Sequence, residues 1–388
     1  MRIFVLGTGA SGALLAHLLT RQGHRVTCGA KEPERARRFL GRRSSLPVVA
    51  VNARNLWGIV RAARGCHLLV NCSPAVFNEV VMRAALRLRT HYVDLSTHMT
   101  RNPFKAEQFA YDERFRKKRR VAVITAGVAP GLDNLLAMRA AAMLDRVEAV
   151  HIRLYEGTES EDPISQWSAE VAFDEAISRP RVVRDGRFRF AKRFGEPEKF
   201  RFPAPIGKVK VVLTAQDEVA ILPHRIPLRE MDVKIGGEEI ERLRRWYRQG
   251  KLHRSRGLVA SRFPGTLTPR QVARLIRRGV LHNARLAVAV VVRGTRGEQT
   301  VEIRSDVSFP TLYQIRQRGL SVTPVSYASA HMAAIFVRHF PRKASGVFAP
   351  CMLPGDVRQA ILADARRQGF GITTRVKVRK QNQDSDED

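Results

Sequence analysis

The chain has 388 residues, 44% of them hydrophobic, which is enough for two or three folded domains with their own cores. Its 68 lysines and arginines against 36 acidic residues give a net charge of +32, a value typical of proteins that bind nucleic acid or anionic lipid. The basic residues are scattered through every segment, however, and the sequence shows no nucleic-acid module and no apolar run of membrane-spanning length. We therefore expect neither nucleic acid nor membrane as a partner. We assign part of the charge to a site that attracts an anionic cofactor and carboxylate substrates.

The first elements of the chain predict a dinucleotide-binding loop. An apolar run at residues 2–6 is typical of a buried strand, and a Gly-x-Gly-x-x-Gly motif follows it directly. In this context Gly7 permits the tight turn, Gly9 lets a pyrophosphate approach the backbone, and Gly12 lets the helix at residues 10–22 pack on the strand. We assign cofactor binding to five positions of the loop, namely Gly7, Gly9, Ala10, Ser11 and Gly12. The alternative is a tight turn that binds nothing.

The end of the second predicted strand favours NADP over NAD. The acidic residue that would hold the adenosine ribose is missing near Ala30. Lys31 comes next and Arg35 lies one helical turn further on, which leaves space and positive charge for a 2′-phosphate. We predict NADP as the cofactor, with NAD as second choice. The alternative is that both cations are ordinary solvated residues.

Strand and helix patterns then alternate as far as residue 125. We predict strands at residues 48–51, 67–71, 91–95 and 121–125, and helices at residues 56–64, 77–88 and 104–118. This rhythm predicts an α/β fold with a Rossmann-type, doubly wound parallel sheet, and we assign the dinucleotide-binding domain to residues 1–126.

The pattern changes in the second part of the chain. A half-buried strand is predicted at residues 147–155, and a hairpin with an Asp185-Gly186 turn at residues 181–190. Further strands are predicted at residues 209–214, 231–235, 286–293 and 300–304. They predict an α+β substrate and dimerisation domain at residues 127–322, with a small, basic helical insertion at residues 238–279. Helices from residue 326 and at residues 354–368 suggest that residues 323–388 pack back on the nucleotide domain. We expect the acidic tail at residues 381–388 to be disordered.

Three loops at strand ends are the places where chemistry is expected. Ligands of an open parallel sheet bind outside the carboxyl ends of its strands. The loops at residues 71–74, 91–98 and 125–134 occupy such positions, although each also has the composition of an ordinary turn or helix start. Asp94, Ser96 and His98 do not form a hydrolase triad, because no nucleophile elbow is present. The histidines show no metal-ligand spacing, so we predict no metal.

With these segments described, the chain resembles the saccharopine dehydrogenase-like family, in the branch of saccharopine reductases, lysine 6-dehydrogenases and carboxynorspermidine dehydrogenases. Six segments carry the likeness, at residues 70–74, 91–96, 126–137, 198–209, 222–224 and 346–369. The resemblance implies a nicotinamide-dependent oxidoreductase that transfers hydride at an amine or imine carbon of an amino-acid substrate, or of a polyamine-type one.

The resemblance also implies site residues. It places Cys72, Ser73, Pro74 and Gly131 at the cofactor, and it suggests four residues for the reaction pocket, namely Asp94, His91, Asp133 and Asn134. Neither the motifs nor the resemblance identifies a general base. The alternative function is therefore a non-catalytic dinucleotide-binding regulator or a basic interaction protein.

Compartment and assembly are the last expectations. The four cysteines show no CxxC spacing, which predicts reduced thiols and a cytoplasmic protein, and the strand at the start of the sequence leads us to expect no signal peptide. A second sheet so rich in valine and isoleucine needs a covered face, which predicts a homodimer. The alternative is that the domain's own helices cover it.

Overall fold

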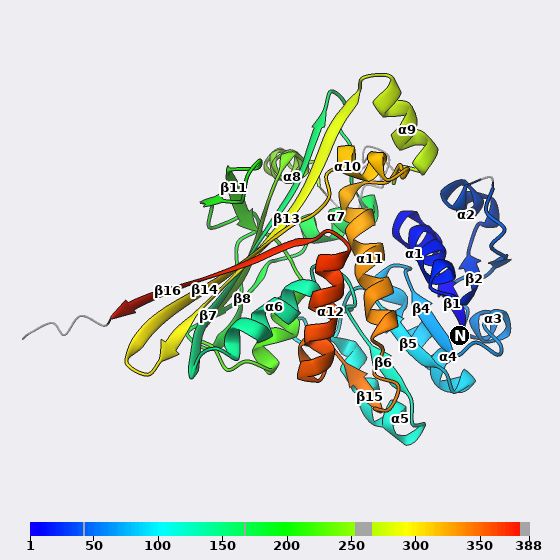
Figure 1. Cartoon of the computed structure of the whole chain (residues 1–388), viewed down its shortest axis with the longest axis horizontal. Coiled ribbons are helices and arrows are strands. Elements are labelled where there is room, and N and C mark those ends of the chain that lie inside the picture. Colours follow the sequence, from blue (N-terminus) through cyan, green and yellow to red (C-terminus); the bar gives the residue numbers. More distant parts are fainter. Residues whose placement is uncertain (42, 167, 253–265, 381–388) are drawn as a thin grey trace, which may run out of the picture.

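The structure is a computed structural model that describes residues 1–41, 43–166, 168–252 and 266–380. It contains two sheets with helices packed between and around them (Figure 1). The predicted tail at residues 381–388, and residues 253–265 of the predicted insertion, lie outside the described residues. Within the described chain, no helix is both long enough and apolar enough to cross a membrane.

The first sheet is a seven-stranded parallel sheet with the order β15-β6-β5-β4-β1-β2-β3. Its strands are β1 (Arg2–Leu6), β2 (Arg25–Ala30), β3 (Val48–Ala50), β4 (Leu68–Asn71), β5 (His91–Asp94), β6 (Val121–Val123) and β15 (Gly346–Phe348). The chain order reverses between β1 and β4, which creates the switch point where such sheets bind ligands. The predicted Rossmann-type sheet is confirmed, with one strand more than the sequence indicates.

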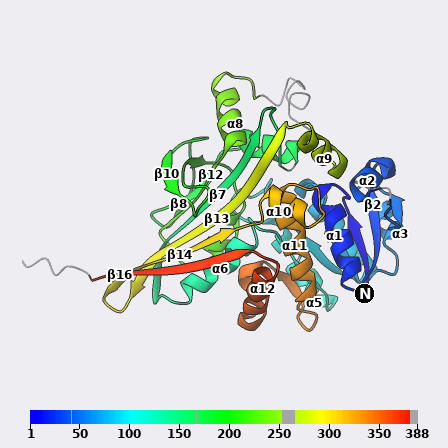
Figure 2. The ribbon, with the colours of Figure 1, turned by 45° about the horizontal axis from the view of Figure 1, so that its top comes forward.

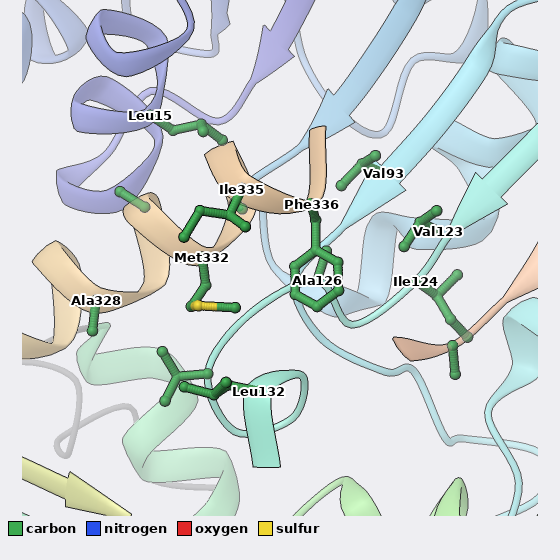
Figure 3. Packing of buried hydrophobic residues seen from close by; sticks show 14 of the residues in the cluster. Leu15, Val93, Val123, Ile124, Ala126, Leu132, Ala328, Met332, Ile335 and Phe336 are labelled. Carbon is green, nitrogen blue, oxygen red and sulfur yellow. The ribbon is translucent and has the colours of Figure 1, made fainter. Parts of the chain in front are cut away.

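Helices cover this sheet because its strands are apolar on both faces. They are α1 (Ala10–Arg21), α2 (Pro33–Leu40), α3 (Leu56–Ala62), α4 (Asn78–Leu88), α5 (Asp112–Lys117), α11 (Pro324–Arg338) and α12 (Gly355–Arg367), with the short 3-10 helices η1 (Ala75–Phe77), η2 (Glu107–Tyr111) and η6 (Pro350–Met352). Helix α11 packs beside α1. Figure 3 shows its Ile335 and Phe336 among the apolar residues between Leu15 of α1 and Val93 of β5.

The second sheet is a nine-stranded mixed sheet with the order β10-β11-β12-β7-β13-β14-β16, and the hairpin β8-β9 pairs with β12. Its strands are β7 (Arg146–Ser160), β8 (Arg181–Arg184), β9 (Arg187–Phe190), β10 (Glu198–Arg201), β11 (Lys208–Leu213), β12 (Glu230–Gly236), β13 (Leu281–Arg296), β14 (Gln299–Ser308) and β16 (Gly371–Lys380). The accompanying helices are α6 (Leu132–Ala141), α7 (Ala169–Ile177), η3 (Glu218–Ala220), η4 (Leu222–His224), α8 (Glu238–Arg248), α9 (Pro269–Arg277) and α10 (Leu312–Gln317). Figure 2 shows the long strands β7, β13 and β14 running side by side.

Both faces of the second sheet are covered by the chain itself at its centre. Val288 and Val290 of β13 are fully buried on the face that packs against α6, α10 and α11. On the opposite face Ala287 and Ala289 are buried in a smaller cluster with Phe202, which lies just after β10. Among the described residues the chain itself therefore covers the centre of this sheet, whereas Val376 and Val378 of the edge strand β16 are exposed.

Two further predictions need correction. The helix predicted at residues 104–118 is reduced to η2 and α5, because Glu107 Oε1 accepts hydrogen bonds from the backbone of Thr100 and Arg101 and holds the preceding segment as a loop. The segment at residues 323–388 also divides between the sheets: β15 pairs with β6, whereas β16 pairs with β14. The predicted helices at its start are α11 and α12.

Candidate dinucleotide and substrate site

The glycine loop lies between β1 and α1, at the switch point of the first sheet. Gly7 has φ +92°, and a Cβ atom there would lie 2.5 Å from the backbone of Ser73. A Cβ atom on Gly12 would lie 2.0 Å from the carbonyl oxygen of Gly7. Both positions therefore accept only glycine, for reasons of conformation and of space.

Gly9 is different, because a Cβ atom there would meet no atom within 4 Å. It is the N-cap residue of α1, where no side chain caps the helix and no acidic residue lies in the first turn. The first amides of α1, at Ala10 and Ser11, thus remain available beside open space. A pyrophosphate fits this arrangement, because amides and the helix dipole favour an anion at a helix start.

The end of β2 carries the residues expected to distinguish NADP from NAD. Lys31 and Arg35 are both exposed, and neither forms an ion pair within the described chain. Glu32 is the N-cap residue of α2 and offers a carboxylate nearby. Within the described chain, the end of β2 therefore carries two unpaired cations and one acid.

The loop after β4 is organised by Asn71, which is 1% exposed. Its side-chain oxygen accepts hydrogen bonds from the Ser73 amide (3.1 Å) and from the Ser73 hydroxyl (2.5 Å). Its amide group donates to Asn78 at 2.8 Å, and Asn78 donates in turn to the Ser96 carbonyl at 2.9 Å. This chain of bonds fixes Cys72, Ser73 and Pro74 against the glycine loop and joins the loops after β4 and β5.

Asp94 ends β5 and is 1% exposed. One carboxyl oxygen accepts the Thr125 amide at 2.7 Å, and the other accepts the Tyr92 hydroxyl at 2.9 Å and the Gln108 amide at 3.1 Å. Burial raises the pKa of Asp94 to about 7, although these three donors oppose the shift. The side chain ties together the loops after β5 and β6.

Asp133 and Asn134 lie in the first turn of α6, and both are fully buried. Asp133 Oδ1 accepts the amides of Gly131 (2.8 Å) and Asn134 (2.6 Å). Asp133 Oδ2 and both amide atoms of the Asn134 side chain have no hydrogen-bond partner in the described part of the chain. The two side-chain atoms of Asn134 therefore call for a partner that the described residues do not supply.

Glu218, in η3, is the fully buried neighbour of Asp133. Burial, and the carboxyl group of Asp133 beside it, raise the pKa of Glu218 well above its ordinary value. Burial likewise raises the pKa of Asp133. Two adjacent buried carboxyl groups cannot both be ionised at low cost, so the pair holds a proton at neutral pH.

Two contacts bring the second sheet over this edge of the first. Asp217, just after β11, accepts the backbone amide of Thr97 at 2.8 Å. The His224 ring lies 2.7 Å from the carbonyl oxygen of Phe104, and Phe104 also packs against Phe188 of β9 with ring centroids 5.2 Å apart. The segment after β5 is therefore held against the second sheet.

The loop after β5 is also braced by an ion-pair cluster. His98 Nδ1 lies 2.9 Å from Glu79 and 3.7 Å from Glu107, and the hydrogen bond to Glu79 raises the pKa of His98. These residue types are also those of metal sites. Here they pair with one another and hold the loop against α4.

Most of the predicted site residues meet at the carboxyl edge of the first sheet, but His91 does not. His91 is the first residue of β5, where its ring accepts the Val121 amide and packs on Phe340. It lies at the opposite end of the strand from Asp94, so its candidacy as a reaction-pocket residue was wrong. Sequence reasoning in turn missed Tyr92, Gln108 and Glu218. The polar run at residues 216–218 after the apolar β11 was a usable signal for Glu218.

Comparison with known proteins agrees with this geometry. Residues 3–123 match the family model described as the saccharopine dehydrogenase NADP binding domain. The whole chain is similar in structure to apo saccharopine dehydrogenase (L-Glu forming) from Saccharomyces cerevisiae, with a TM-score of 0.70 and 13% identity. That match covers 97% of this chain and 99% of the yeast chain. At this identity it establishes the fold.

Two more distant structures share less. A meso-DAPDH variant with DAP, from Clostridium tetani E88, has a TM-score of 0.43 at 12% identity over 92% of this chain and 95% of its own. A probable dehydrogenase from Thermotoga maritima has a TM-score of 0.42 at 10% identity over 95% and 96%. Neither similarity is close enough to support an argument about this site.

Proposed function

We propose that the chain belongs to a saccharopine dehydrogenase-like family, which the match of residues 3–123 to the NADP binding domain of saccharopine dehydrogenase supports. We propose further that it is an NADP-dependent oxidoreductase acting on a carbon–nitrogen bond of an amino-acid substrate. The observation that carries the proposal is the convergence of four loops at one sheet edge. The loops after β4, β5 and β6 are joined there by the bonds of Asn71, Asn78 and Asp94. The loop after β1 lies against the loop after β4, where Gly7 approaches the backbone of Ser73. The open space at Gly9 lies at the same edge.

The cofactor half of the site follows from the glycine loop. Gly9 and the amides of Ala10 and Ser11 hold the pyrophosphate, and Ser73 with Pro74 lies beside the nicotinamide ribose. Lys31 and Arg35 bind the 2′-phosphate and favour NADP over NAD. When bound, NADP supplies or accepts the hydride.

The substrate half follows from the buried polar groups of α6 and η3. The side chain of Asn134 needs both a donor and an acceptor, and a substrate that carries an amino group and a carboxylate offers both. Asp133 and Glu218 hold a proton beside it, which suits a step in which a nitrogen gains or loses a proton. Asp94 has no free oxygen, so it acts as a positioning residue that aligns the loops.

Absorbance at 340 nm tests the proposal. The protein is assayed in both directions with a panel of basic and dicarboxylic amino acids, their keto-acid or aldehyde partners, and both nicotinamide cofactors. We expect turnover with at least one pair and a cofactor affinity about tenfold higher for NADP than for NAD. Gly9→Ala is the matched control, since its methyl group fills the phosphate space without touching the protein.

Three outcomes decide between the alternatives. Turnover that disappears in Gly9→Ala at unchanged thermal stability supports the proposal. Cofactor binding without turnover on any member of the panel contradicts it and favours a non-catalytic regulator. Equal affinities for the two cofactors contradict only the roles proposed for Lys31 and Arg35, and leave the rest of the proposal standing.

Assembly and compartment complete the proposal. A homodimer is supported by the edge position of β16, which has a paired neighbour on one side only in the described chain. A reducing compartment such as the cytoplasm is supported by the four cysteines, which are all free thiols.

A further inference from the structure

A second concave site lies on the second sheet, away from the nucleotide loops. The turn between β10 and β11 sits over β14 and β16 and encloses a pocket of about 370 Å³. Small-molecule sites typically have volumes of about 300–1,000 Å³. Three arginines and one aspartate line the pocket together with the apolar turn at residues 202–205.

The pocket lies on the face of the sheet opposite the helices. Ile303 and Val307 of β14 are buried in the main core, on the helix-covered face. Arg304 and Asp306 alternate with them and so point to the other face. The glycine loop and Asp94 belong to the first sheet. That sheet lies on the other side of the helices that cover the second sheet (Figure 1).

Among the described residues, only Arg304 of these three arginines pairs with a carboxylate. Arg304 donates to both carboxyl oxygens of Asp306, at 3.0 and 2.9 Å, and its guanidinium lies 4.6 Å from the ring centroid of Phe200. It also donates to the backbone carbonyl of Arg201 at 2.6 Å. Within the described residues, the side chains of Arg201 and Arg375 form no hydrogen bond or ion pair. The pocket therefore carries two uncompensated positive charges.

The pairing of β14 with β16 places two of these arginines side by side. Arg304 lies directly opposite Arg375 in the ladder, and like charges in that position destabilise a sheet. The next pair on the same face is the complementary Glu302 and Lys377. Asp306 compensates Arg304 but not Arg375, so an anion beside Arg375 offsets the positive charge that remains in this pair.

We propose that this pocket binds a small anion with at least two negative charges, through phosphate or carboxylate groups. Arg201 and Arg375 supply guanidinium groups that pair with such oxygens in a bidentate manner, and Arg304 is held in place beside them. Phe202 and the prolines of the turn contact the carbon skeleton of the ligand. The site is separate from the dinucleotide site and does not depend on the reaction proposed above, although its test uses the proposed binding of NADP.

Thermal unfolding tests the proposal on the full chain. The protein is first saturated with NADP, so that added anions cannot act at the glycine loop. Inorganic phosphate and citrate are then titrated in separate series at constant ionic strength, with chloride as the reference. We expect a saturable rise of the midpoint with one of them, which identifies the ligand group as phosphate or carboxylate.

The variants Arg201→Gln and Arg375→Gln should each weaken this response about tenfold or more, because each removes a charge-assisted contact. Without anion, Arg375→Gln should raise the midpoint by about 1 °C, since it removes the like-charge pair. The matched control is Lys377→Gln, on the same face of β16, which should leave the anion response unchanged. Unchanged NADP binding shows that each variant is folded.

Three results would overturn the proposal. The first is the absence of any saturable response in the wild-type protein. The second is an equal response in Arg201→Gln, Arg375→Gln and Lys377→Gln. The third is a dimer, by light scattering, that the Arg201→Gln/Arg375→Gln double variant converts to a monomer, because the pocket is then an interface between copies of the chain.

Discussion

Asp94 and Asp133 are both buried carboxyl groups near the same sheet edge, yet they differ in their hydrogen bonds and in their neighbours. Asp94 receives three hydrogen bonds, from Thr125, Tyr92 and Gln108. Asp133 receives backbone bonds on one oxygen only, while its other oxygen faces a second buried acid, Glu218. The first arrangement fixes loops, whereas the second keeps a proton and polar groups available. In the proposed function, rigid positioning and reaction chemistry thus belong to different carboxylates, and three predictions probe the division.

The largest effect is expected from Asp94→Ala. The change leaves three buried donors without an acceptor, and we expect a loss of about 3–5 kcal/mol in the free energy of unfolding, together with weaker NADP binding. Urea denaturation with and without NADP measures both. Asp94→Asn keeps an acceptor for Thr125 but turns an amide group toward Gln108, and it should fall between the wild type and Asp94→Ala. Wild-type stability of Asp94→Ala would show that the network does not position the loops.

An intermediate effect is expected from Glu218→Gln, and it depends on pH. An unfolded glutamate loses its proton near pH 4.3. Folded Glu218 keeps it to higher pH, so the folded state binds more protons and the free energy of unfolding falls as the pH rises above that value. Glutamine has no such proton, and the variant should reduce this slope by up to about 1.4 kcal/mol per pH unit. Denaturation curves between pH 4 and 8 provide the measurement, and an unchanged slope would contradict a shared proton.

The smallest effect is expected from Tyr92→Phe. It removes one of the three donors to Asp94 and leaves the other two, so we expect a loss of about 1 kcal/mol with little change in NADP binding. Because burial is the main cause of the raised pKa of Asp94, and the Tyr92 hydroxyl opposes it, the variant should raise that pKa further. NMR titration of the Asp94 carboxyl carbon measures the shift. A lower pKa in the variant would mean that the hydroxyl does not stabilise the carboxylate.

The sequence is sufficient to predict the surroundings of Asp94 in outline, but not those of Asp133. The glycine loop, the strand periodicity and the position of Asp94 at a strand end are local patterns, and the structure confirms the parallel sheet that they predict. Glu218 could not be placed beside Asp133, because no local pattern links a residue after β11 to the start of α6. His91 failed as a site residue because a resemblance over residues 91–96 does not separate the two ends of one strand.

The same limit applies to the sheet edges. Strand β15 has only three residues, which is too few for a periodic pattern. Strand β16 is rich in basic residues, so its sequence resembles a polar tail. The anion pocket combines a turn after β10 with two strands at the far edge of the sheet. Its arginines could not be distinguished by sequence from the many other arginines of a strongly basic chain.

The position of β15 has a consequence for the synthesis of the protein. The ribosome releases β1 to β6 long before it releases α11 and β15, which complete the same sheet. Until then β6 is an edge strand, and the apolar surface that α11 covers faces water (Figure 3). We therefore expect the nascent nucleotide domain, and a fragment that ends near residue 123, to aggregate more readily than the complete chain.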